Sequence, residues 1–174
     1  MNEPTLPPRH LANVSKTRRA NGVRYIFIFS AMVCFTACRS ASPLPPVSLS
    51  EPGWTIRQGQ AVWRRYHDTP DIAGELLVAT HQDGRALIQF TKTPVPFLTA
   101  QTSSNAWQIQ FVAENRIYSG RGTPPARLGW LQLTRCLNGI SPPFSWRWQQ
   151  FEEGRWRLEN KTSGELLEGF LTTP

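Results

Sequence analysis

The sequence predicts a mainly β (α+β) fold, in which one helix packs against an antiparallel β-sheet. From residue 54 onward, short segments rich in β-branched and aromatic residues alternate with turn residues at close intervals, which is typical of such a sheet. One segment, Pro125–Asn138, departs from this alternation and has the apolar spacing of a helix. The chain has 174 residues, 40% of them hydrophobic, which is enough to bury one core of this kind.

The first predicted strands form a meander. Its clearest turn is Gln82-Asp83-Gly84, because Asp-Gly readily adopts the positive φ values that tight hairpins need. Other turns contain Pro, Ser, Asn or Asp. The predicted strands are Gln60–Tyr66, Gly74–Thr80, Arg85–Lys92, Phe97–Gln101, Ala106–Val112 and Arg116–Ser119.

The predicted helix, Pro125–Asn138, has recognisable start and stop signals. Thr123 followed by Pro124 resembles an N-cap with proline in the first turn, and Gly139 is a good C-terminal stop. Its leucines can pack one face against the sheet. Beyond the helix, Phe144, Trp146 and Trp148 alternate with polar residues, and two further strands are predicted at Arg155–Lys161 and Glu165–Leu171.

Residues 1–37 have the order of a bacterial secretory signal peptide. A basic segment precedes the apolar run Tyr25–Ala37, which has 13 residues. A membrane-spanning helix needs roughly 20, so a permanent transmembrane anchor is the weaker interpretation. The run ends in Phe35-Thr36-Ala37-Cys38, which resembles the lipobox of bacterial lipoproteins, where the cysteine is lipidated and becomes the new N-terminus. Cys34 is a poorer candidate because the preceding Val33 is too bulky for the small-residue site.

This resemblance predicts a protein anchored to a membrane through lipid on Cys38. Arg39 follows the cysteine, as in lipoproteins that are not retained in the inner membrane, so we expect an outer-membrane location facing the periplasm. Residues 38–53 are rich in Ser and Pro and predict an extended tether. The folded domain is expected to span residues 54–174.

The basic charge does not indicate nucleic-acid binding. Five of the 19 basic residues and one of the 12 acidic residues precede Cys38, so 14 basic and 11 acidic residues remain. A net charge of about +3 is too weak to predict a phosphate-binding surface.

No motif of catalysis or metal binding stands out, so the sequence predicts neither an enzyme nor a cofactor nor a metal site. His67 beside Asp68 is most simply a solvated loop residue, and His81 an exposed flank of the Asp-Gly turn. Cys136 on the predicted helix is most simply a buried, inert residue. The seven tryptophans, all after Cys38, either fill the core or line an apolar cavity.

The stretch Gly74–Gly139 resembles part of the LolA/LolB lipoprotein-carrier family, and LolB most. The similarity lies in GELLVATHQDGRALIQF, then WQIQFVAENRIYSG, then the helical segment ARLGWLQLTRCLNG. The resemblance implies a curved antiparallel sheet or half-barrel, closed by a helix, whose cavity binds acyl chains or another lipoprotein. By position in the resembling segment, the cavity-lining residues would be Trp107, Phe111, Trp130, Leu131 and Leu137.

Two functions of different classes therefore remain open. The first is an acyl-chain or lipoprotein-binding domain, which predicts a hydrophobic cavity between sheet and helix. The second is a non-catalytic structural or assembly lipoprotein that binds an envelope protein, which predicts a filled core. A periplasmic hydrolase would need a convergent polar site that the sequence does not offer.

Overall fold

The structure is a computed structural model that describes residues 43–172. The predicted signal peptide, the lipobox and Cys38 lie outside the described residues. Residues 40–174 form one compact unit, and this unit contains the whole sheet and the whole core set out below. Because a domain with its own core can fold independently, we treat residues 40–174 as the folding unit.

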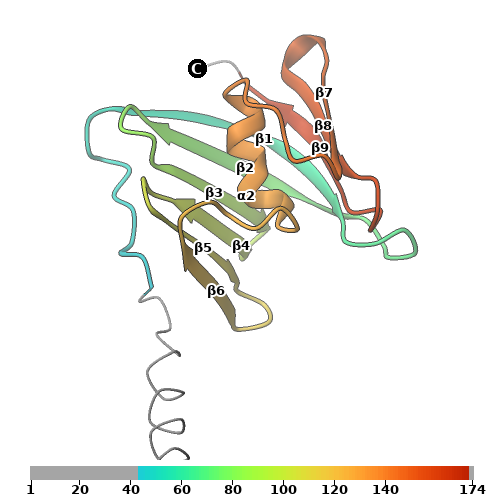
Figure 1. Cartoon of the computed structure of the whole chain (residues 1–174), viewed down its shortest axis with the longest axis horizontal. Coiled ribbons are helices and arrows are strands. Elements are labelled where there is room, and N and C mark those ends of the chain that lie inside the picture. Colours follow the sequence, from blue (N-terminus) through green and yellow to red (C-terminus); the bar gives the residue numbers. More distant parts are fainter. Residues whose placement is uncertain (1–42, 173–174) are drawn as a thin grey trace, which may run out of the picture. The chain divides into compact units, whose positions relative to one another are not determined.

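Nine antiparallel strands form one unclosed, curved sheet, and a single α-helix of the described residues packs on it (Figure 1). The predicted fold class is therefore confirmed. In chain order the elements are β1 (Trp54–Arg64), β2 (Ile72–His81), β3 (Ala86–Lys92), β4 (Val95–Thr102), β5 (Ala106–Phe111), β6 (Arg116–Arg121), α2 (Gly129–Leu137), β7 (Trp146–Gln150), a 3-10 turn (Glu152–Gly154), β8 (Arg155–Asn160) and β9 (Leu166–Leu171).

The strand order places the first strand in the middle of the sheet. The order is β6-β5-β4-β3-β2-β1-β9-β8-β7, so β1 to β6 form a meander on one side of β1. The chain then passes through α2 and returns as β7 to β9, and β9 pairs with the free side of β1. The sheet edges are β6 and β7.

Side chains alternate between the two faces of each strand, and one face carries the core. Trp63 on β1, Phe90 on β3, Ile109 on β5 and Leu158 on β8 are all at most 3% exposed and belong to one apolar cluster. The helix α2 packs on this same face, in contact with β3, β4 and β8. Core side chains and α2 thus cover this face of the sheet over its central strands.

Glycines let β1 and β9 approach each other closely. A Cβ atom at Gly59 would clash with the carbonyl oxygen of Phe170, and one at Gly169 would clash with that of Gln60. Both obstacles are backbone atoms, which cannot swing away as a side chain can. The tight contact between the two halves of the sheet therefore depends on residues without a side chain.

The helix begins later than predicted. Instead of starting at Pro125, it starts at Gly129, because residues 125–128 form a turn tied to β7. The Leu128 N–H donates to the carbonyl oxygen of Pro125 at 3.1 Å, and the indole Nε1 of Trp146 donates to the carbonyl oxygen of Ala126 at 2.5 Å.

The predicted stop of the helix is confirmed. Gly139 has a φ of 78°, its N–H donates to the carbonyl oxygen of Cys136, and the Ile140 N–H donates to that of Arg135. These two bonds form a Schellman C-cap, which requires the left-handed conformation that glycine adopts easily.

Candidate functional site

A cavity of about 1080 Å³ opens at the β5–β6 end of the sheet. Its walls are β5, β6, the end of β1, the turn between β8 and β9, and the segment that leads into α2. Its volume lies slightly above the range of roughly 300–1,000 Å³ for ligand pockets. Aromatic and aliphatic residues make up most of the lining, namely Trp63, Tyr66, Trp107, Ile109, Phe111, Ile117, Tyr118, Ala126, Leu128, Gly129 and Trp130.

Three aromatic rings from distant parts of the chain meet in this wall. The Trp63 ring stacks on Phe111 with centroids 6.0 Å apart and meets Trp130 edge-on at 5.9 Å. The ring of Phe90, a core residue, contacts Trp130 with centroids 5.0 Å apart. The cavity wall is therefore continuous with the packed core, and its shape is fixed by rigid side chains.

One carboxyl group, that of Glu165, lies among the lining residues. Its Oε1 accepts a hydrogen bond from the indole Nε1 of Trp63 at 3.0 Å. Burial raises the pKa of Glu165 to about 7, although the Trp63 bond and the charge of Arg65 act in the opposite direction. Desolvation wins because a carboxylate against apolar walls has lost most of its hydration. The neutral, protonated form of Glu165 is therefore favoured to a much higher pH than in an exposed glutamate.

The backbone around Glu165 is fixed by the turn that precedes β9. The Asn160 N–H donates to the carbonyl oxygen of Glu165 at 2.8 Å, and the Asn160 side-chain oxygen accepts from the N–H groups of Thr162 and Ser163. The Glu165 N–H donates to Ser163 Oγ at 3.3 Å. The carboxyl group is thus presented from a rigid turn.

Two arginines, Arg65 and Arg127, belong to the cavity lining. Arg65 donates from Nη1 to Glu114 at 3.0 Å, and Arg116 lies 3.4 Å from the same carboxylate. Arg127 also lines the cavity, beside the segment that leads into α2. The lining thus combines a mostly apolar wall with a few charged and polar groups, the usual arrangement in a site for an amphipathic molecule.

The structure brings together three of the five residues expected to line a cavity. Trp107, Phe111 and Trp130 line it, whereas Leu131 and Leu137 lie elsewhere. Leu131 is 2% exposed inside the core, and Leu137 packs against the core from the last turn of α2. They are displaced because the cavity is at the N-terminal end of the helix, so residues further along α2 cannot reach it.

Sequence reasoning missed the contributions of Trp63, Tyr118 and Glu165. Trp63 and Tyr118 lie on predicted strands. Three strands separate β1 from β5 in the sheet, and the local pattern does not encode the sheet curvature that brings Trp63 against Phe111. Glu165 is the first residue of a predicted strand, and a single acidic residue in that position carries no signal of burial.

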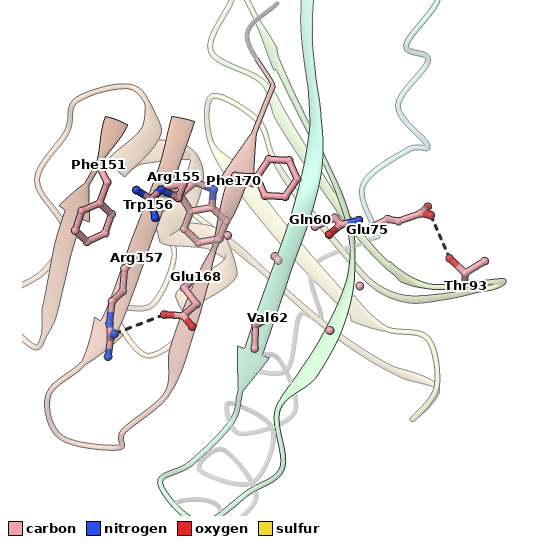
Figure 2. A pocket seen from close by; sticks show the side chains of 14 residues that line it. Gln60, Val62, Glu75, Thr93, Phe151, Arg155, Trp156, Arg157, Glu168 and Phe170 are labelled. Carbon is pink, nitrogen blue, oxygen red and sulfur yellow. Dashed lines mark hydrogen bonds and ion pairs between the residues drawn. The ribbon is translucent and has the colours of Figure 1, made fainter. Parts of the chain in front are cut away.

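A second hollow, of about 740 Å³, lies on the opposite face of the sheet across β2, β1, β9 and β8 (Figure 2). Its floor includes Val62, and its sides carry the ion pair Arg157–Glu168 at 3.5 Å and the Glu75–Thr93 hydrogen bond at 3.3 Å. Charged groups that are already paired line much of this hollow. It is the weaker candidate for an apolar ligand.

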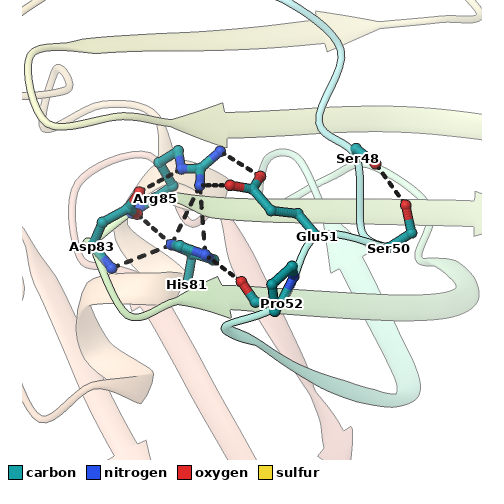
Figure 3. A network of polar contacts seen from close by, with 7 residues as sticks. All are labelled: Ser48, Ser50, Glu51, Pro52, His81, Asp83 and Arg85. Carbon is teal, nitrogen blue, oxygen red and sulfur yellow. Dashed lines mark hydrogen bonds and ion pairs between the residues drawn. The ribbon is translucent and has the colours of Figure 1, made fainter.

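The segment 43–53, assigned to the tether from its composition, contacts the outer face of the sheet. Arg85 bridges Glu51 at 2.9 Å and Asp83 at 2.7 Å, and His81 Nε2 lies 3.0 Å from the carbonyl oxygen of Pro52 (Figure 3). The His81 side chain is only 12% exposed, so the expectation of an exposed turn flank was wrong. The segment covers what would otherwise be a solvated turn.

Two buried glutamines hold the same segment further upstream. Gln108 Oε1 accepts from the Leu44 N–H at 2.8 Å, and Gln101 Nε2 donates to the Leu44 carbonyl oxygen at 3.4 Å. Gln101 and Gln108 are register partners on β4 and β5, and they are 7% and 8% exposed. Together they form a clamp on the backbone of one residue.

The described residues contain no cluster of His, Cys, Asp or Glu that could hold a metal ion. Cys136 is 1% exposed, and burial raises the pKa of its thiol to about 11, so the thiolate is scarce at neutral pH. Within residues 43–172 no helix is long and apolar enough to cross a bilayer.

No protein-family model matches the chain. No curated protein matches it significantly either.

Proposed function

We propose that this domain binds acyl chains, either free or attached to another lipoprotein, in the cavity beside β5, β6 and the start of α2. The carrying observation is the cavity itself, with a volume of about 1080 Å³ and a wall built largely from aromatic and aliphatic residues. Each methylene group removed from water contributes about 0.8 kcal/mol, so a wall of this kind favours a long hydrocarbon chain.

The cavity supports acyl binding over a purely structural role, since a structural domain needs only a filled core. The second function is favoured by exposed apolar side chains in the loops that flank β7, namely Ile140, Phe144 and Phe151, of which Phe144 is 95% exposed. A few such side chains are a small contact area for a stable protein interface. We therefore propose acyl binding as the function of the domain. In the cell envelope, such binding would serve lipoprotein localisation to the outer membrane or a related process.

The proposal is tested by placing a charge in the cavity wall. Ile117 on β6 lines the cavity and is 48% exposed, so Ile117→Asp should fold normally yet weaken binding of a fluorescent fatty acid at least tenfold. Val95 on β4 is 55% exposed and lies away from the cavity, so Val95→Asp is the matched control and should bind as the wild type does. Equal affinities of both variants would refute the site.

We propose that lipid on Cys38 anchors the domain to the outer membrane, on the periplasmic side. The support is the order of basic segment, apolar run and lipobox in the sequence. Cys38→Ala should abolish incorporation of labelled palmitate and release the protein from the membrane fraction, whereas Cys34→Ala should change neither. Labelling that persists in Cys38→Ala would contradict this anchor.

A further inference from the structure

We propose that Glu165 is the polar anchor of the cavity, and that its protonated carboxyl group donates a hydrogen bond to the carbonyl oxygen of an acyl ester or amide. The proposal rests on the proposed function, because it supplies the head-group contact of the same acyl ligand. It adds a chemical class, since a plain hydrocarbon has no such oxygen.

The carboxyl group of Glu165 lies where a ligand in the cavity can reach it. Glu165 lines the cavity, and one of its oxygens, Oε1, is committed to the indole N–H of Trp63. The carboxyl group forms no ion pair with any side chain of the described residues, because the nearby Arg65 is held by Glu114. The carboxyl group of Glu165 is therefore a polar group that a ligand in this largely apolar cavity can contact.

The charges of the lining residues indicate which kind of ligand group suits this site. The lining contains Arg127 and Arg65, the latter paired with Glu114, against Glu165 alone, so it offers a cationic head group no excess of negative charge. A carboxyl group that is substantially neutral near pH 7 can donate a proton but attracts a cation poorly. A neutral acceptor, the carbonyl oxygen of an ester or amide, fits both conditions.

Other titratable groups near Glu165 could also make ligand binding depend on pH, and their effects must be distinguished from that of Glu165. Arg65 after β1, Arg127 before α2, and the phenols of Tyr66 and Tyr118 share the lining. His67 lies against Gly164, the residue before Glu165. Histidine ordinarily titrates near neutrality, so a pH effect on binding needs a His67→Gln control.

The experiment compares two probes on residues 40–174, below their micellar concentrations. The first probe is 1-monomyristoylglycerol, which has an ester carbonyl, and the second is 1-O-tetradecylglycerol, the ether with the same chain. Wild-type protein should prefer the ester at pH 6, and its affinity for the ester should fall about tenfold by pH 8 as Glu165 ionises. The His67→Gln variant should behave in the same way.

Two substitutions at Glu165 make the outcome specific. Glu165→Gln keeps an N–H donor, so it should retain the ester preference and lose the pH dependence. Glu165→Leu should bind both probes equally. Equal binding of ester and ether by the wild type at pH 6, or an ester preference that survives in Glu165→Leu, would overturn the anchor. Failure of every variant to bind either probe would instead overturn the proposed function.

Discussion

Trp63, Phe111 and Trp130 form the aromatic wall of the cavity although they come from β1, β5 and α2. Each ring also packs on the core, so the same residues stabilise the fold and shape the site. The sequence left open whether the tryptophans fill a core or line a cavity. The structure shows that these two roles share residues, because the cavity is an unfilled continuation of the core.

Glu165 makes the stability of the domain depend on pH. Its pKa is about 7 in the folded chain and 4.5 for an ordinary glutamate. Below about pH 4.5 both folded and unfolded chains are protonated, so the group contributes nothing; as pH rises toward 7, only the unfolded chain ionises freely and stability falls. Above pH 7 the loss is complete, at up to about 3 kcal/mol.

Glu165→Gln should remove this loss. Compared with the wild type, the variant should gain up to about 3 kcal/mol in the free energy of unfolding between pH 5 and pH 8, measured by urea titration. Glu75→Gln, at an exposed carboxyl group, controls for the loss of one negative charge. A stability difference between wild type and Glu165→Gln that is the same at both pH values would contradict the burial of this carboxyl group.

At the scale of elements, the local sequence predicted the hairpin turn and the end of the helix better than the beginning of the helix. The Asp83-Gly84 turn and the stop at Gly139 follow from the positive φ of a single glycine, which is a local property. The start of α2 does not follow from a local property, because the turn before it is held by Trp146, a residue on β7. Tertiary contact therefore overrode a good local start signal.

The segment 43–53 also escaped prediction. Its Ser and Pro residues cannot form a core, yet the backbone of Leu44 is held by glutamines of β4 and β5. Such a clamp depends on two side chains that alternate outward on adjacent strands, and composition alone cannot reveal it.

Gln108→Leu should detach this segment. The change removes the acceptor for the Leu44 N–H and should cost about 1 kcal/mol of stability. Hydrogen exchange of the amides in residues 43–53 should accelerate while the sheet stays protected. Gln110→Leu, on the same strand and face, is the matched control and should leave the exchange unchanged. Identical exchange in the two variants would show that the clamp does not hold the segment.

At the scale of the whole molecule, the strand order explains both the cavity and the limits of prediction. Each hairpin of the meander is local, but β9 pairs with β1 from more than a hundred residues further along the chain, as in Trp63 opposite Leu167. This pairing brings the turn that carries Glu165 beside the Trp63 indole and thereby completes the cavity. No periodicity in the sequence encodes a pairing at such a distance.

The central claim is that the cavity takes up an acyl chain. Native mass spectrometry of residues 40–174, mixed with an excess of monoacyl lipid, tests it most directly. We expect a complex of one protein with one lipid for the wild type and for Val95→Asp, and strongly reduced complex for Ile117→Asp. A wild-type spectrum that contains only ligand-free protein under lipid excess would contradict the claim.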